Sequence, residues 1–229
     1  MGEFRMKYYK FELKMVWANV ISLLLFIVGF IVLGITYPNT IEFGSYSFLV
    51  VIISMIIYLV IHELIHGISF MCFCKDKKNV KYGAMLEKGV LYAMCQERIS
   101  KKGIIISLLA PTIVLTCIAL IPAYIFKIDL LAMLAIFNLA GATGDLMMTT
   151  FAIKLPKDSK YIDYDNVIGF YLISKEDLSK LKSPFLKFIE SGKDSDKLIN
   201  KDIKPIYISK YSWIVIAFLA VISIAYIFI

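Results

Sequence analysis

Histidine is almost absent from this chain, since His62 and His66 are the only two among its 229 residues. Any site that needs an imidazole must therefore use one or both of them. The four cysteines show no Cys-x-x-Cys spacing, which argues against a thiolate zinc site or a redox pair. Internal repeats, low-complexity tracts and glycine-rich phosphate loops are also lacking. Repeat folds and phosphate-loop nucleotide sites are thereby excluded.

Charge is missing from several long stretches, and 59% of the residues are hydrophobic. Five apolar runs are each near the length of about twenty residues with which a helix crosses a bilayer. They cover about 16–36, 47–73, 104–126, 129–153 and 211–229. The chain is therefore predicted to be an integral membrane protein. No cleavable signal peptide is expected, because the first run lacks a small-x-small site at its end and is long enough to remain as a helix.

Lysine and arginine are distributed unevenly between the segments that join these runs. The N-terminal segment holds 4, the segment 75–103 holds 8 and the segment 154–210 holds 12, whereas the two remaining connections hold none and 1. Because positive residues are enriched on the cytoplasmic side, these three segments are predicted to be cytoplasmic and the C-terminus to be outside. The same asymmetry explains the net charge of +7 without nucleic acid as a partner.

The reducing environment of the cytoplasm bears on the cysteines. Cys72, Cys74 and Cys95 would face or border that side of the membrane in this topology. Disulfides are rare in reducing compartments. Free thiols are therefore expected.

The expected fold class is an all-α membrane protein of about five transmembrane helices, with a short β-hairpin-like connector and a small cytoplasmic α/β appendage. Residues 1–153 would form the membrane core, which holds a candidate metal site. Residues 154–210 would form a cytoplasmic segment, and residues 211–229 a C-terminal transmembrane helix. Within the cytoplasmic segment, residues 167–173 are strand-like, and the capping-box pattern from Ser174 predicts a short helix through about Ile189.

The hairpin-like connector is predicted from two short strand-like stretches, 80–86 and 90–95, around a turn at Glu87-Lys88-Gly89. Such a hairpin could offer an edge with which an extended substrate pairs. The alternative is an ordinary amphipathic connector at the membrane surface. The sequence does not choose between the two.

Both histidines belong to an HExxH pattern, His62-Glu63-Leu64-Ile65-His66, inside the second apolar run. On a helix, His62 and His66 lie one turn apart on one face, where two imidazoles can bind one Zn²⁺. Glu63 is then the candidate general base that takes a proton from metal-bound water. The alternative is a pair of histidines that only form hydrogen bonds inside a helix bundle. The metal is favoured because ionisable residues within membrane helices are costly and mark functional sites.

Asp145 is a carboxylate inside the fourth apolar run. It lies about eight residues from the cytoplasmic end of that run, and His62 and His66 lie about twelve and eight residues from the end of theirs, so the three depths agree within roughly one helical turn. Asp145 is therefore the candidate third ligand, which leaves a fourth position open for water. The alternatives are an Asp145 that is hydrogen-bonded to Thr143 or Thr149, or one that lies nearer the interface.

Two further features lie close to these candidates in the helices. Asn138, two turns before Asp145 on the same face, could hold a substrate backbone or only form hydrogen bonds between helices. Pro111 interrupts the third apolar run, where a kink could widen a cavity beside the metal. Proline is also common in membrane helices without any such role.

These residues together resemble the membrane-embedded zinc metalloproteases of the site-2 protease type, and most closely a bacterial family described as "putative zincin peptidases". The resemblance covers roughly residues 48–173 and depends on the segments His62–Gly67 and Asn138–Asp145. It implies His62, His66 and Asp145 as zinc ligands and Glu63 as the catalytic base. The chain departs from the site-2 pattern, because no proline follows Asn138 and Leu146 stands where that pattern has glycine.

The function expected from the sequence is a zinc metallopeptidase that hydrolyses peptide bonds in or near the cytoplasmic half of the bilayer. Its partners would be the lipid bilayer and a membrane protein or peptide substrate, and its expected location is the bacterial cell membrane. The alternative is a non-catalytic membrane protein, regulatory or of the immunity type, in which a structural metal joins two helices.

Overall fold

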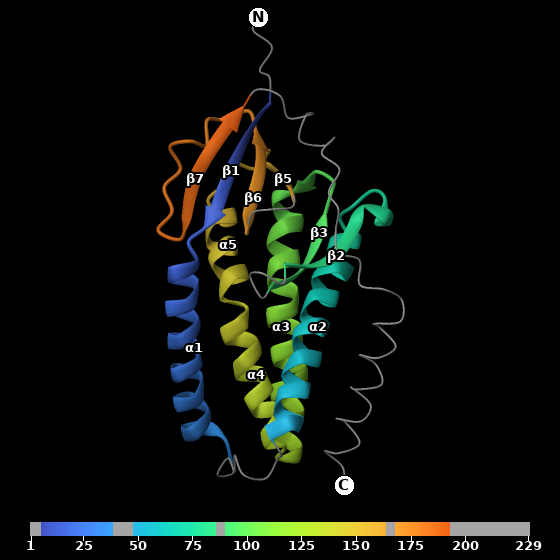
Figure 1. Ribbon diagram of the computed structural model, residues 1–229, viewed down its shortest axis with the longest axis vertical. Coiled ribbons are helices and arrows are strands. Elements are labelled where there is room, and N and C mark those ends of the chain that lie inside the picture. Colours follow the sequence, from blue (N-terminus) through green and yellow to red (C-terminus); the bar gives the residue numbers. More distant parts are fainter. Residues whose placement is uncertain (1–5, 39–47, 86–89, 164–167, 193–229) are drawn as a thin grey trace, which may run out of the picture.

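The structure is a computed structural model that describes residues 6–38, 48–85, 90–163 and 168–192. Long helices stand side by side, and a β-sheet covers one end of them (Figure 1). The helices are α1 (Met15–Thr36), α2 (Phe48–Met71), α3 (Lys101–Phe126), α4 (Asp129–Gly141) and α5 (Thr143–Ile153), with a short 3₁₀ turn η2 (Lys77–Asn79). The strands are β1 (Lys7–Leu13), β2 (Val80–Met85), β3 (Val90–Cys95), β4 (Ile99–Ser100), β5 (Lys160–Ile162), β6 (Gly169–Ser174) and β7 (Leu186–Gly192).

The predicted all-α class is wrong, because the described residues form two antiparallel sheets as well as helices. The larger sheet has five strands in the order β4-β5-β6-β1-β7, and β2 pairs with β3 in the smaller one. The strand expected at 167–173 is present as β6. The short helix expected from Ser174 is absent from this described segment. Its place is taken by irregular chain, in which the Ser174 hydroxyl accepts a hydrogen bond from the Glu176 N–H, and then by β7.

Strand β1 holds the five-stranded sheet together, although no strand was expected there. It lies between β6 and β7, with Tyr9 opposite Leu172 and Phe11 opposite Phe170 on one side. Its side chains alternate, because Tyr9, Phe11 and Leu13 are buried while the residues between them are partly or largely exposed. The Phe11 ring lies 4.8 Å from that of Phe151 in α5. This packing joins the sheet to the helices in one hydrophobic core.

Three of the described helices, α1, α2 and α3, are long and apolar enough to cross a membrane. The predicted runs 16–36, 47–73 and 104–126 correspond to them closely. The predicted fourth run is instead two helices, α4 and α5, bent by 47° at a break near Ala142, and the pair passes the same test as one broken span. The predicted fifth helix, 211–229, lies outside the described residues.

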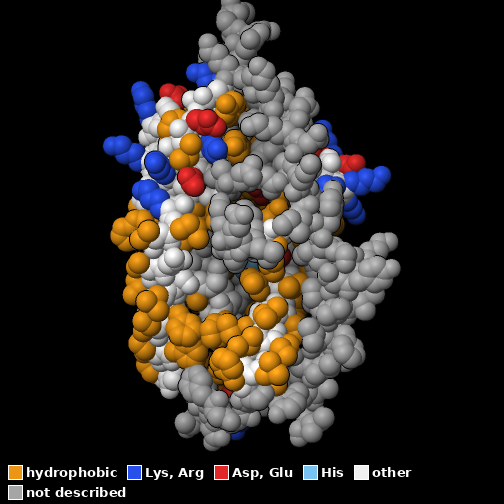
Figure 2. Space-filling model, viewed as in Figure 1, with side chains coloured by type: hydrophobic (Ala, Val, Ile, Leu, Met, Phe, Trp, Pro, Cys, Tyr) orange, Lys and Arg blue, Asp and Glu red, His pale blue; other side chains and the backbone are white. Residues whose placement is uncertain are grey.

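Charged side chains gather around the sheet end, whereas hydrophobic side chains cover the visible part of the helices (Figure 2). Many of these apolar side chains are largely exposed in α1 and α2, for example Ile35 at 78% and Phe48 at 81%. Exposed apolar helices below a charged sheet are consistent with a membrane protein.

The predicted hairpin is present as β2 and β3, which pair from Val80 opposite Cys95 to Met85 opposite Val90. Its predicted turn, residues 87–89, lies outside the described residues. Strand β3 also runs beside the end of α2, where Cys74 and Cys95 form a disulfide. The expectation of free thiols is therefore wrong for this pair, because the fold brings Cys74, just after α2, next to Cys95 at the end of β3. Cys72 and Cys117 are free.

Candidate metal centre

Helix α2 presents both histidines to the protein interior. His62 and His66 are one helical turn apart, and they are only 7% and 6% exposed, although most of α2 is apolar. Their rings meet edge to face with centroids 4.9 Å apart. The helical spacing of the motif therefore produces one buried pair of imidazoles.

The break between α4 and α5 carries Asp145 toward this pair. Near the break, the carbonyl of Ala140 accepts hydrogen bonds from the hydroxyl of Ser22 in α1 at 2.8 Å and from that of Thr143 at 2.6 Å. Asp145 then lies in the first turn of α5, where the N-terminal end of a helix favours a carboxylate. The break therefore places a new helix N-terminus beside Asp145, and this end of α5 favours its negative charge.

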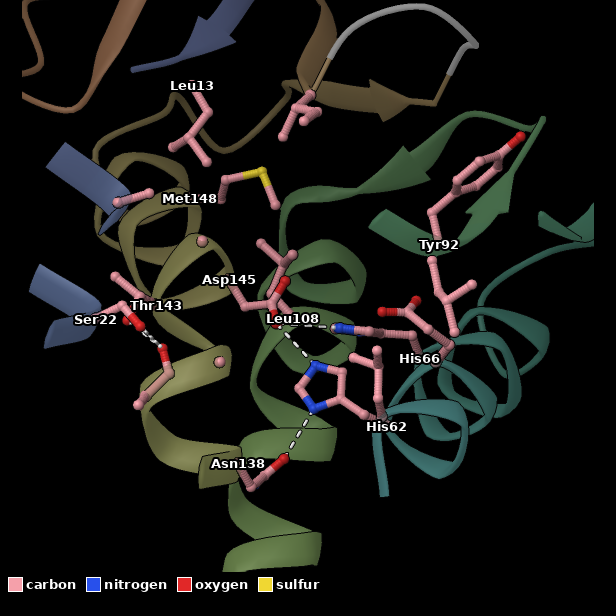
Figure 3. Close-up of a pocket in the computed structure, with 18 of the residues that line it drawn as sticks. Leu13, Ser22, His62, His66, Tyr92, Leu108, Asn138, Thr143, Asp145 and Met148 are labelled. Carbon is pink, nitrogen blue, oxygen red and sulfur yellow. Dashed lines mark hydrogen bonds and ion pairs between the residues drawn. The ribbon is translucent and has the colours of Figure 1, made fainter. Parts of the chain in front are cut away.

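The three candidate ligands converge on one point (Figure 3). The Oδ2 atom of Asp145 lies 3.1 Å from Nε2 of His62 and 3.2 Å from Nε2 of His66. One ligand atom from each of the three residues lies within 4.8 Å of the others, so the group could hold a metal ion. Asp145 thus contacts the two histidines, whereas the hydroxyl of Thr143, an alternative partner named from the sequence, donates to the carbonyl of Ala140.

The opposite nitrogens of both rings are held by oxygen acceptors. Nδ1 of His66 donates to the backbone carbonyl of Ser107 at 2.7 Å. Nδ1 of His62 lies 2.9 Å from Oδ1 of Asn138, whose amide nitrogen donates to groups of α3. Asn138 therefore stands behind His62, on the far side of the ring from Asp145 (Figure 3).

This pattern of donors and acceptors fits a divalent cation. A neutral imidazole has one N–H, and on both rings an oxygen acceptor takes it at Nδ1. In this neutral form each Nε2 would present a lone pair to the carboxylate of Asp145, and three electron-rich atoms would face one another. These atoms would repel one another, and a cation bound between them would remove the repulsion by accepting all three as ligands. The contacts at Nδ1 would fix the orientation of the rings. Two positive charges would also be balanced by the carboxylates of Asp145 and Glu63.

Glu63 is tied to the hairpin. Its Oε2 atom accepts a hydrogen bond from the backbone N–H of Ala93 in β3 at 2.8 Å. The same hairpin packs closely on the following turn of α2, because a Cβ atom at Gly67 would overlap the hydroxyl of Tyr82. The glycine that follows the motif therefore allows β2 to approach the helix.

A cavity of about 860 Å³ adjoins the three candidate ligands. Residues of all five described α-helices and of β3 line it, and Glu63 and Asn138 are among them. At its sheet end lie Tyr161 and Asp163. Burial raises the pKa of Tyr161 well above its ordinary value of 10, and the carboxylate of Asp163 raises it further. Its hydroxyl therefore stays protonated as a hydrogen-bond donor.

The structure thus brings His62, His66, Asp145 and Asn138 into direct contact and leaves Glu63 beside them on the next position of α2. The roles of these residues as ligands, base or substrate contact remain predictions. The backbone groups of Ser107 and Ala93 were not expected at the site, because no residue type in a sequence marks a main-chain donor or acceptor.

A family model described as "putative zincin peptidase" matches residues 55–160. The matched stretch contains all five candidate site residues. No curated protein and no solved structure matches the chain. The match supports the resemblance to zincin peptidases and suggests a zinc metallopeptidase. It carries no indication of the site-2 protease type.

Proposed function

We propose that the chain is a membrane-embedded zinc metallopeptidase that hydrolyses peptide bonds in or near the cytoplasmic half of the bilayer. One observation carries the proposal. Both Nε2 atoms of the HExxH histidines meet the carboxylate of Asp145, while both Nδ1 atoms are held from behind. The match to zincin peptidases over residues 55–160 agrees with it.

The chemistry assigned to each residue follows from this arrangement. Zn²⁺, when bound, supplies a Lewis acid that activates water and polarises a peptide carbonyl. His62, His66 and Asp145 would hold it with one ligand atom each. Glu63 takes the proton of the attacking water and passes it to the leaving amine. The N–H of Ala93 holds one oxygen of Glu63, so that the other is available for the proton.

The cavity suggests how a substrate reaches this centre. Residues Leu91–Met94 of β3 line it, and β2 pairs with the opposite edge of β3. An extended peptide could therefore pair with the cavity edge of β3 and place a peptide bond beside the metal. The proposed substrate is a membrane protein or a membrane-associated peptide, because Phe26, Leu59 and Phe137 make the walls from α1, α2 and α4 apolar.

The proposed position in the membrane follows from the distribution of charge. Helices α1, α2 and α3 would cross the bilayer, and the lysine-rich sheet would lie on the cytoplasmic side. Asp145 lies in the half of the helical layer that is next to the sheet, since α5 leads directly into β5. The site would then open within the cytoplasmic half of the bilayer.

The substitution Glu63→Gln tests the proposal. The purified protein in lipid nanodiscs would be loaded with zinc and incubated with fluorogenic peptides that contain an apolar segment. We expect hydrolysis to fall by about 10²- to 10⁴-fold, which is the usual contribution of a general base, while bound zinc stays equimolar. The matched control is Glu190→Gln, which changes a glutamate of β7 outside the cavity lining and should leave both quantities unchanged.

The outcomes distinguish a peptidase from a non-catalytic membrane protein with a structural metal. If the Glu63→Gln variant hydrolyses the peptides as fast as wild type, the role of Glu63 as general base is contradicted. Equimolar zinc in wild type without hydrolysis of any probe would favour the non-catalytic protein with a structural metal. An Asp145→Ala variant that keeps full zinc affinity would remove Asp145 from the ligand set.

A further inference from the structure

Helix α3 supplies no candidate ligand, yet it holds both histidines from behind. The carbonyl of Ser107 accepts the Nδ1 hydrogen of His66 at 2.7 Å. Asn138 contacts His62 with its amide oxygen. Its amide nitrogen lies 3.0 Å from Oγ1 of Thr116 and 3.4 Å from the carbonyl of Pro111. These contacts extend along α3 from Ser107 to Thr116, and Pro111 lies between these two residues.

The carbonyl of Ser107 would ordinarily be occupied. In an α-helix the N–H of residue i donates to the carbonyl of residue i−4, so the N–H of residue 111 would donate to Ser107. Proline has no N–H, and its ring also pushes against the carbonyl of residue i−4. Ser107 therefore keeps a carbonyl that lacks its helical donor, and His66 donates to it instead.

We infer that Pro111 is a positioning residue of the metal centre, because it reserves the carbonyl of Ser107 for His66. That carbonyl can only accept, so it keeps the hydrogen of His66 on Nδ1. Nε2 is thereby left with the lone pair that a metal requires. Pro111 touches neither metal nor substrate in this scheme. It acts through the backbone of α3 and the ring of His66.

The second proline of α3 provides a built-in comparison. Pro122 lies eleven positions later and removes the helical donor of Ile118 by the same rule. Ile118 is 59% exposed, and neither Pro122 nor Ile118 lines the cavity. Both prolines interrupt the same helix, but only Pro111 frees a carbonyl that a candidate ligand uses. An effect of proline on α3 in general can therefore be separated from an effect on His66.

The inference rests on the proposed metal centre, and it can be tested with Pro111→Ala and Pro122→Ala. Alanine restores an N–H at either position and favours the helix, so both variants should fold. Zinc affinity would be measured by competition with a chelator. The state of the imidazoles would be read from long-range ¹H–¹⁵N spectra of zinc-free protein in nanodiscs with ¹⁵N-labelled histidine. Only two rings contribute to these spectra, because the chain has two histidines.

The spectra are recorded at a pH at which the zinc-free imidazoles are neutral, and in wild type we then expect His66 to carry its single hydrogen on Nδ1. In Pro111→Ala the restored N–H competes for the carbonyl, so part of the population should move the hydrogen to Nε2. Zinc affinity should fall by about ten-fold or more, as it does when a partner of a ligating histidine is lost. Pro122→Ala should match wild type in both measurements.

Two results would overturn the inference. One is a Pro111→Ala protein that keeps the hydrogen on Nδ1 and binds zinc within about two-fold of wild type. The other is an equal loss in Pro122→Ala, which would assign the effect to the helix as a whole. A wild type that binds no zinc would defeat the proposed function instead, and the spectra of the zinc-free proteins would still decide the role of Pro111.

Discussion

The carboxylate of Glu63 in α2 accepts a hydrogen bond from the backbone N–H of Ala93 in β3, at 2.8 Å. This N–H points away from β2, so Ala93 directs its main-chain groups to the cavity edge of the hairpin. Leu91 lies two residues earlier and directs its groups to the same edge, because strands alternate with a period of two. The candidate base and the edge proposed for substrate are thus parts of one arrangement.

The substitution Leu91→Pro tests that edge. Proline removes the N–H of Leu91 and is tolerated where a strand's N–H does not take part in the ladder. We expect KM for a peptide substrate to rise by roughly three- to ten-fold, the equivalent of one hydrogen bond, with zinc content unchanged. The control Leu91→Ala shortens the side chain but keeps the N–H. An equal rise of KM in both variants would assign the effect to the side chain.

The substitution Asn138→Ala tests whether Asn138 orients His62 or binds substrate. Loss of its Oδ1 leaves the Nδ1 hydrogen of His62 without this acceptor, so zinc affinity should fall by about 10- to 100-fold in a chelator competition. The control is Asn19→Ala, which removes another asparagine from the cavity wall. A higher KM with unchanged zinc affinity would instead support the substrate-binding role predicted from the sequence.

Gly67→Ala should destabilise the protein, because the new methyl group meets the hydroxyl of Tyr82. Overpacking of this kind costs about 1–3 kcal/mol. Gly34→Ala is the matched control in α1, where nothing lies within 4 Å of the added Cβ, and it should be neutral or stabilising by up to about 1 kcal/mol. Thermal unfolding in detergent compares the two. Equal midpoints would mean that β2 does not pack on α2 as closely as described.

Glu97 makes the stability of the fold depend on pH. Burial raises the pKa of its carboxyl, but hydrogen bonds from the side chain of Asn79 and the backbone of Lys75 and Asp76 lower it by more, to a net value below its ordinary 4.5. A lowered pKa stabilises the fold above pH 4.5, and this contribution is lost as the pH falls through the lowered value.

The substitution Glu97→Gln should therefore lower the unfolding midpoint near neutral pH and make little difference well below pH 4.5. Thermal unfolding at the two pH values measures this. Glu190→Gln serves as the control, because the carboxylate of Glu190 is half exposed and only loosely paired with Lys10. A difference between wild type and Glu97→Gln that is as large in acid as at neutral pH would contradict the expectation.

The sequence predicts the helices around the site well, because apolar length and helical period are local properties. Counting residues from the helix ends was enough to expect Asp145 near His62 and His66. The bend between α4 and α5 was not expected, since no proline marks it and Ala142 is an ordinary helix residue. The carbonyl of Ala140 beside the bend accepts a hydrogen bond from Ser22 of another helix, which a local pattern does not reveal.

The sheet was missed for a different reason. Strand β1 pairs with β6, which lies about 160 positions later in the chain, and such pairings leave no local mark. The alternation of Tyr9, Phe11 and Leu13 was visible, but the interspersed charges also suit a segment at a membrane surface. After Ser174 the capping pattern favoured a helix, and pairing of β7 with β1 prevailed over it.

The ring of His62 lies between two residues of one chain segment, so the number of residues between those two is fixed. Asn138 lies before the break and Asp145 after it, and each contacts a different nitrogen of one imidazole. One residue added or removed between them would turn α5 by about 100° relative to α4 and carry Asp145 away from the ring. A search for other chains with this centre should therefore hold the seven-residue interval constant and let the residues inside it vary.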